Sequence, residues 1–196
     1  ESTTTYEGSG RLTQDRTLGT DADVVRIDFS LRVGPDATLT VEPGTTLSFA
    51  QGTALSVAGT LSASGSCSAP IFFAGQSDAR GIWSGITFEG GASGTLDHVL
   101  IENGGSEDGA GLGIRSTGPV TVRNSEIRGS RNFGVAIGQN ARLETFSGNG
   151  VTGNAEPIEV TASNVRDIAG DNALTGNDTD RLHVLASIDY VIPEGQ

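Results

Sequence analysis

Short segments in which apolar and polar residues alternate recur along this chain at nearly even intervals. Leu39, Leu47 and Leu55 stand eight residues apart, and each lies in such a segment just before a turn that contains glycine. Alternation over four residues indicates a strand with one buried face. Many short strands without a helical segment between them predict a chain that winds coil upon coil. The pattern continues at residues 60–61, 70–73, 86–88, 99–101, 120–122 and 135–137.

The turns and the composition fit such a winding. Three strands and their turns within residues 31–75 make a repeat of roughly 20–25 residues, a length typical of strand solenoids. Glycine accounts for 29 residues, and only 35% of the chain is hydrophobic. A narrow stack of short strands needs many tight turns and little bulk per residue. We therefore predict an all-β fold: one solenoid of short strands stacked coil on coil.

The two ends of the chain differ from its middle. Residues 1–10 have no buried period beyond Tyr6, so they are predicted to form a flexible arm or a strand that pairs with a partner. Residues 11–196 are assigned to the β-helix domain. Asparagines at expected strand corners indicate either a ladder of stacked side chains or isolated turn residues. These asparagines are Asn124, Asn132, Asn149 and Asn154.

The charge is strongly acidic. The chain has 24 acidic and 12 basic residues, and every basic one is arginine, so the net charge is −12. Such a charge opposes binding to nucleic acid or to an anionic membrane, and no apolar run is long enough to insert into a bilayer. A lysine-free acidic surface is halophile-like, although codon bias explains it equally well. Because methionine is absent even at position 1, we expect a secreted or cell-surface protein whose export signal has been removed.

One ordered set of motifs lies at residues 38–49, 55–61, 69–73, 81–88 and 96–105. The order of turns and strands in this set resembles that of the right-handed parallel β-helix repeat proteins of bacterial and archaeal cell surfaces, the non-enzymatic branch of the pectate-lyase-like superfold. The resemblance covers roughly residues 30–185. It implies the fold, one right-handed parallel β-helix of roughly seven coils, and a surface location. It implies no activity, because a fold of this kind carries many functions.

Polysaccharide hydrolases on this fold need carboxylates that converge on one bond. The carboxylates here are scattered, although residues one coil apart lie close together, which keeps a pair such as Asp97 and Glu126 open. Exposed aromatic platforms for a glycan are few, and Trp83 is expected in the core. No catalytic residue is therefore predicted, and a polysaccharide-binding or polysaccharide-cleaving module is the alternative.

The sequence offers little for metals or for thiol chemistry. Cys67 lies alone in a small-residue turn whose neighbours supply no base or cation. His98 and His183 lie in expected strands and should face solvent, so no transition-metal site and no cofactor are predicted. Calcium is the one ion left open, at the acidic turns of residues 106–109 and 177–180.

The end of the sequence resembles its beginning. Residues 26–35 are similar to residues 187–196, with Ile27 and Ile188 161 residues apart. Apart from chance, either the chain is one module of a tandem array, or its last coil docks on the first coil of another copy. We expect a structural subunit that self-associates head to tail into a filament; an adhesin domain of a longer surface protein is a further alternative. The predicted assembly residues are Tyr6, Ile27, Phe29, Leu185, Ile188, Tyr190 and Ile192.

Overall fold

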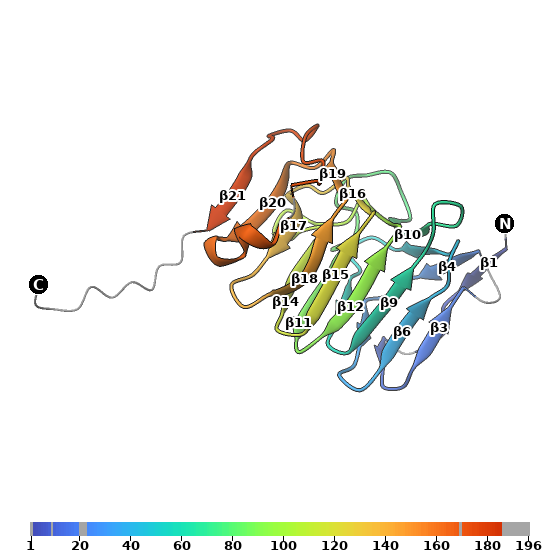
Figure 1. The fold of residues 1–196 in the computed structure, drawn as a ribbon. Helices are drawn as coiled ribbons and strands as arrows, with labels where there is room; N and C mark the ends of the chain where they lie inside the picture. Colours follow the sequence, from blue (N-terminus) through green and yellow to red (C-terminus); the bar gives the residue numbers. More distant parts are fainter. Residues whose placement is uncertain (1, 9, 20–22, 169, 186–196) are drawn as a thin grey trace, which may run out of the picture.

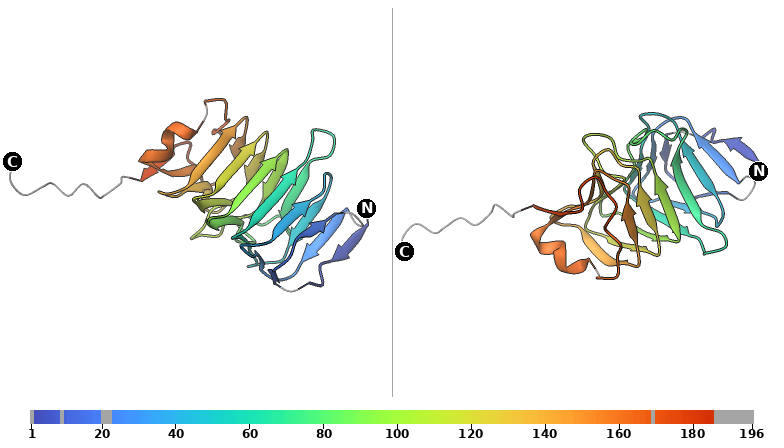
Figure 2. Two further views of the ribbon diagram at one scale, coloured as in Figure 1. Left: turned by 60° about the horizontal axis from the view of Figure 1, so that its bottom comes forward. Right: turned by 90° about the horizontal axis from the view of Figure 1, so that it is seen from above.

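The chain forms a parallel β-solenoid of about seven turns, which confirms the predicted fold class. The structure, a computed structural model, describes residues 2–8, 10–19, 23–168 and 170–185. Its coils stack in chain order along one axis, with the N-terminal coil at one end and β21 (Leu182–Leu185) at the other (Figure 1; Figure 2).

Three parallel sheets form the walls of the solenoid, because every third strand returns to the same sheet. Sheet A contains β1 (Thr3–Thr5), β4 (Val24–Ile27), β7 (Thr46–Phe49), β10 (Ile71–Gly75), β13 (Val99–Glu102), β16 (Glu126–Arg128) and β19 (Gly150–Thr152). Sheet B contains β2 (Arg11–Leu12), β5 (Leu31–Val33), β8 (Leu55–Val57), β11 (Ile86–Gly90), β14 (Leu112–Ser116), β17 (Phe133–Ile137), β20 (Glu156–Thr161) and β21. Sheet C contains β3 (Arg16–Leu18), β6 (Thr38–Val41), β9 (Thr60–Ser64), β12 (Ser93–Asp97), β15 (Pro119–Arg123) and β18 (Arg142–Ser147). A 3₁₀ helix, η1 (Ala162–Asp167), follows β20.

Inward side chains stack in columns because successive coils keep one register, apart from a shift between β15 and β18 in sheet C. Burial of each such aliphatic side chain stabilises the fold by about 1.5–3 kcal/mol relative to exposure. Sheet B contributes two columns that run from one end of the solenoid to the other. The first contains Leu31, Leu55, Ile86, Leu112, Val135, Ile158 and Leu182. The second contains Leu12, Val33, Val57, Phe88, Ile114, Ile137, Val160 and Val184.

The strands expected from alternation lie where the sequence indicates. Leu39, Leu47 and Leu55 are fully buried and occupy one strand in each of the three sheets. Trp83 is also fully buried, as expected: its ring stacks on Phe49 with centroids 4.2 Å apart, and its Nε1 donates to the Glu102 carbonyl at 2.9 Å.

The N-terminal segment belongs to the solenoid. Thr3–Thr5 form β1, which pairs with β4, and Tyr6 is buried. The partner of this strand is therefore the chain's own second coil. Residues 186–196 of the predicted β-helix domain lie outside the described residues.

Asparagine ladders join the coils at two corners. Between sheets A and B, Asn154 Oδ1 accepts the Ser130 amide at 2.9 Å, and Asn177 Oδ1 accepts the Asn154 amide at 3.1 Å. Between sheets C and A, Asn149 plays the same role with Ser125 and Asn172. The ladder interpretation is confirmed for Asn149 and Asn154. Asn124 instead turns a corner with a left-handed φ of 51°.

Asn154→Ala is expected to destabilise the protein by about 2–4 kcal/mol, because it leaves the buried Ser130 amide and the Ile127 carbonyl without their partner. Asn140→Ala, in an exposed turn, is the matched control and should change stability by less than about 0.5 kcal/mol. Urea unfolding followed by circular dichroism measures both. Equal midpoints for the two variants would contradict a structural role for the ladder.

Candidate functional site

The assembly residues predicted in the first coils have different environments. Tyr6 is 6% exposed, and its ring centroid lies 5.8 Å from that of the partly buried Phe29. Ile27 is fully buried in β4, which pairs with β1 on one side and β7 on the other. Ile27 therefore belongs to the interior, whereas Tyr6 and Phe29 close the N-terminal end of the core.

The C-terminal end presents apolar side chains to solvent. Leu182, Val184 and Leu185 of β21 are 36%, 47% and 38% exposed. Leu182 and Val184 continue the two inward columns of sheet B, and β20 is the one described strand that pairs with β21. The core thus reaches the surface at this end. The other predicted assembly residues, Ile188, Tyr190 and Ile192, lie outside the described residues.

A second candidate site lies at the corner where the chain passes from sheet C to sheet A. In three successive coils this corner contains one residue with a left-handed backbone: His98 with φ 51°, Asn124 with φ 51° and Gly148 with φ 64°. This conformation costs most L-residues about 1–2 kcal/mol, and Asn, Asp and His tolerate it best. In the preceding coil a longer loop, residues 65–70, makes the same passage and contains Cys67.

Cys67, His98 and Asp97 form a continuous relay at this corner. The Cys67 Sγ lies 3.2 Å from His98 Nε2, and His98 Nδ1 lies 2.8 Å from Asp97 Oδ1. Cys67 is exposed, while the side chains of His98 and Asp97 are 27% and 13% exposed. His98 was expected in a strand facing solvent; it instead occupies the corner between β12 and β13, because a residue with a left-handed φ cannot continue a strand.

Two neighbours hold Asp97 in its charged form. Arg123 Nε donates to Asp97 Oδ2 at 2.9 Å, and Asn124 Nδ2 donates to Asp97 Oδ1 at 3.0 Å. Burial acts to raise the pKa of Asp97, but the hydrogen bonds from Asn124, Arg123 and His98 and the charge of Arg123 outweigh it, so the pKa lies below its usual value. An ionised Asp97 favours the imidazole tautomer with hydrogen on Nδ1, which directs the Nε2 lone pair of His98 toward Cys67.

Backbone hydrogen bonds fix Cys67 relative to the other two residues. The Gly65 amide donates to the Asp97 carbonyl at 2.8 Å, and the Ile71 amide donates to the His98 carbonyl at 3.1 Å. A Cβ at Gly65 would lie 2.8 Å from the His98 carbonyl oxygen, so this close approach requires glycine. The loop that contains Cys67 is therefore attached on both sides to the corner that contains His98.

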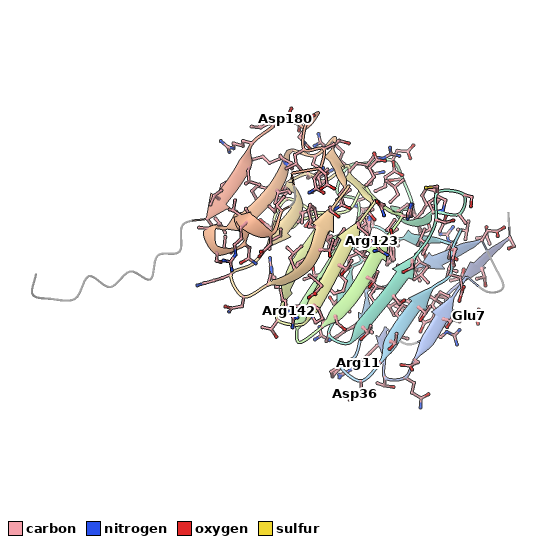
Figure 3. The ribbon with its side chains drawn as sticks, viewed as in Figure 1. Glu7, Arg11, Asp36, Arg123, Arg142 and Asp180 are labelled. Atoms are coloured by element: carbon pink, nitrogen blue, oxygen red, sulfur yellow. The ribbon has the colours of Figure 1, made fainter. Side chains whose placement is uncertain are left out.

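A groove of about 400 Å³ runs from this relay over the outer face of sheet A. Phe72 and Leu100 are register partners on this face, and both are half-buried. Glu126, the register partner of Leu100 on the next strand, adds a polar wall. The relay and the groove thus bring a thiol, an imidazole and an apolar surface together. Figure 3 shows Arg123 midway between Glu7 near one end and Asp180 near the other, which places the site far from both ends.

The sequence leaves Asp97 and Glu126 open as a pair of hydrolase carboxylates. In the structure the two carboxylates bind different partners. Asp97 binds Arg123, Asn124 and His98, whereas Glu126 Oε1 contacts Arg128 Nη1 at 3.2 Å. Glu102 contacts the same guanidinium at 2.9 Å. Burial acts to lower the pKa of Arg128, but these two carboxylates raise it above its usual value.

The sequence leaves the acidic turns at residues 106–109 and 177–180 open as calcium sites. Most of their carboxylates instead form hydrogen bonds or ion pairs with other groups of the protein. Asp180 accepts the amides of Gly176 and Asn177 at 3.0 and 2.8 Å, and these bonds lower its pKa despite the small opposing effect of desolvation. Asp178 accepts Arg80 Nη1 at 2.9 Å, and Glu107 lies 3.7 Å from Arg131. Within the described ranges, no group of three His, Cys, Asp or Glu side chains is arranged to hold a metal ion.

Comparisons with known proteins add no relative: no family model matches the chain, and no curated protein or solved structure matches it significantly. Across the part of the chain that the structure describes, no helix has the length and apolar character to cross a membrane. The fold therefore defines the class of protein, a parallel β-solenoid, and function has to be argued from its sites.

Sequence reasoning missed the relay because it judged Cys67 by its neighbours in the chain. The thiol and the imidazole are 31 residues apart, slightly more than one coil. Stacking of successive coils was the signal that would have found the pair.

Asp97→Asn is expected to lower stability at neutral pH by about 1–3 kcal/mol, because it removes charge-assisted hydrogen bonds. Since the pKa of Asp97 is lowered on folding, its contribution is present above the unfolded value near 3.8 and is lost as the pH falls through the folded value. The unfolding midpoints of wild type and variant should therefore converge in acid. Asp36→Asn, in an exposed turn, is the control, and a constant gap for Asp97→Asn down to acid pH would contradict the assignment.

Proposed function

We propose that this chain is an extracellular or cell-surface structural β-solenoid whose copies associate head to tail through their end coils. The observation that carries the proposal is the exposure of Leu182 and Val184, which belong to the core columns of sheet B and lack a covering coil among the described residues. The end of a solenoid normally carries a polar cap. Apolar core side chains that reach solvent at such an end therefore favour contact with a further coil.

The two edge strands of sheet B have the strand direction that parallel pairing between copies requires. Its N-terminal edge is β2 and its C-terminal edge is β21, and all of its strand pairs are parallel. The β2 edge of a second copy stacked in the same direction would extend the ladder from β21 and cover Leu182 and Val184. A contact between two different surfaces leaves a free surface of each kind after every addition, so the assembly grows as a fibre.

The proposed extracellular or cell-surface location is argued from the amino-acid sequence. The resemblance to β-helix repeat proteins of bacterial and archaeal cell surfaces supports an exported protein, and the lysine-free surface with a net charge of −12 suits a salty exterior. The likeness of residues 26–35 to residues 187–196 suits an adhesin domain within a tandem array.

A polysaccharide-binding or polysaccharide-cleaving module is the second candidate, and the groove over sheet A is the observation in its favour. The pairing of Glu102 and Glu126 with Arg128 weighs against a hydrolase pair there.

Incubation with neutral and acidic polysaccharides tests this candidate: new reducing ends or unsaturated products would support cleavage, and retention on immobilised glycan would support binding.

Val184→Asp is expected to weaken end-to-end association by at least ~10-fold, because it places an unpaired charge in an apolar contact. Ser56→Asp is the matched control: it adds the same charge to the outward face of β8, in the middle of sheet B, and should leave association unchanged. Light scattering after size exclusion across a concentration series measures the association, and negative-stain microscopy detects fibres.

Wild-type protein that stays monomeric and forms no fibres at high concentration would overturn the proposal. Equal association of wild type and Val184→Asp would show instead that any assembly uses a different surface.

A further inference from the structure

The relay of Cys67, His98 and Asp97 has the parts of a nucleophilic site. We propose that Cys67 is a nucleophile that takes an acyl group from a small ester or thioester, with His98 as its general base and Asp97 as the residue that positions His98. The site lies on the side of the solenoid, away from β21, so it is independent of end-to-end assembly.

The geometry meets the requirements for an activated thiol. A nucleophile and its base must lie within hydrogen-bond reach, with the base oriented by a third group. The contact of 3.2 Å between Sγ and Nε2 and the contact of 2.8 Å between Nδ1 and Asp97 satisfy both conditions. Such constellations are recognised by their geometry and not by the order of residues in the chain.

The surroundings of the relay hold its three residues in place. His98 occupies a left-handed corner that Asn124 and Gly148 occupy in the next coils, so the regular geometry of this corner places the imidazole beside the thiol. Gly65 permits the close approach of the loop that contains Cys67. Arg123 and Asn124, both from the following coil, hold Asp97 in place.

The groove indicates the class of substrate. Its volume of about 400 Å³ is suited to a small molecule, and its apolar surface comes from Phe72, Leu100 and Pro70. An apolar acyl chain would pack there with its carbonyl carbon near Cys67.

The reaction balances without a redox partner. The Cys67 sulfur attacks the acyl carbon, and its proton passes to His98 Nε2. The bond from the acyl carbon to the leaving oxygen or sulfur breaks, and the leaving group takes that proton. Water then attacks the resulting thioester with His98 as base, which releases a carboxylic acid and restores the thiol.

The experiment uses p-nitrophenyl butyrate as the probe. Wild-type protein should release nitrophenolate in a burst of one equivalent, and mass spectrometry should find one butyryl group on Cys67. The matched control is Cys67→Ser combined with Ser68→Cys, which moves the thiol one residue along the same exposed turn. Its acylation should be at least ~10-fold slower, because general-base catalysis contributes factors of this size or larger.

His98→Asn removes the base while keeping the corner, since Asn103 and Asn124 adopt the same left-handed conformation in this chain. It should slow acylation as much as moving the thiol does. His183→Asn replaces the histidine of β21, far from the groove, and should react at the wild-type rate. Circular dichroism confirms that each variant is folded.

The role of Asp97 is tested by the rate of Cys67 alkylation with iodoacetamide at neutral pH. His98 faces Cys67 and Asp97 directly, Arg123 acts through Asp97, and Glu126 lines the same groove. Asp97→Asn should slow alkylation toward the rate of the displaced thiol, because His98 loses the group that orients it. A variant with a lower melting temperature that is alkylated at the wild-type rate would show that Asp97 has a structural role alone.

Equal acylation and alkylation rates for wild type, the displaced thiol and His98→Asn, all folded, would overturn the proposal. Butyryl groups found on other residues, with Cys67 unmodified, would overturn it as well. Repeating the assay on Val184→Asp separates this outcome from assembly, because the groove is intact in a variant that does not associate.

Discussion

Stacking of inward side chains in one register from coil to coil is the constraint on which the rest of this structure depends. A single coil of three short strands cannot bury its own apolar face, so each coil needs a neighbour above and below. A shift of one residue in any strand would turn its core side chains to solvent. Most differences in coil length therefore lie at the corners, as in residues 65–70 and 76–85, and a register shift between β15 and β18 adds one residue within a strand.

The corners are consequently where this solenoid departs from simple repetition. At the passage from sheet C to sheet A, the same left-handed position holds His98, then Asn124, then Gly148. The exchange of asparagine or glycine for histidine keeps the backbone path and changes the chemistry. The longer loop before it brings Cys67 to that histidine, and the outward residues Phe72 and Leu100 add the apolar surface beside them. A rigid stack thus presents side chains from different coils at one place.

The ends and the side of the solenoid offer two separate surfaces. At β21 the core columns reach solvent through Leu182 and Val184, so the interaction that holds coils together inside the molecule is the one available for holding copies together. The groove uses outward side chains of sheet A, which do not take part in that stacking. The proposed structural role and the proposed reactivity of Cys67 are compatible, because neither surface depends on the other.

The sequence by itself determined the winding, because alternation and glycine turns specify which residues face inward wherever one face is buried. Leu39, Trp83 and the ladder asparagines Asn149 and Asn154 lie where this argument puts them. Only the tertiary structure decided which corners meet. Cys67 and His98 are 31 residues apart, whereas Ser125 and Asn149, at the same corner two coils later, are 24 apart. Loops of different length change the separation between stacked residues, so contacts across coils follow from the three-dimensional register and not from spacing along the chain.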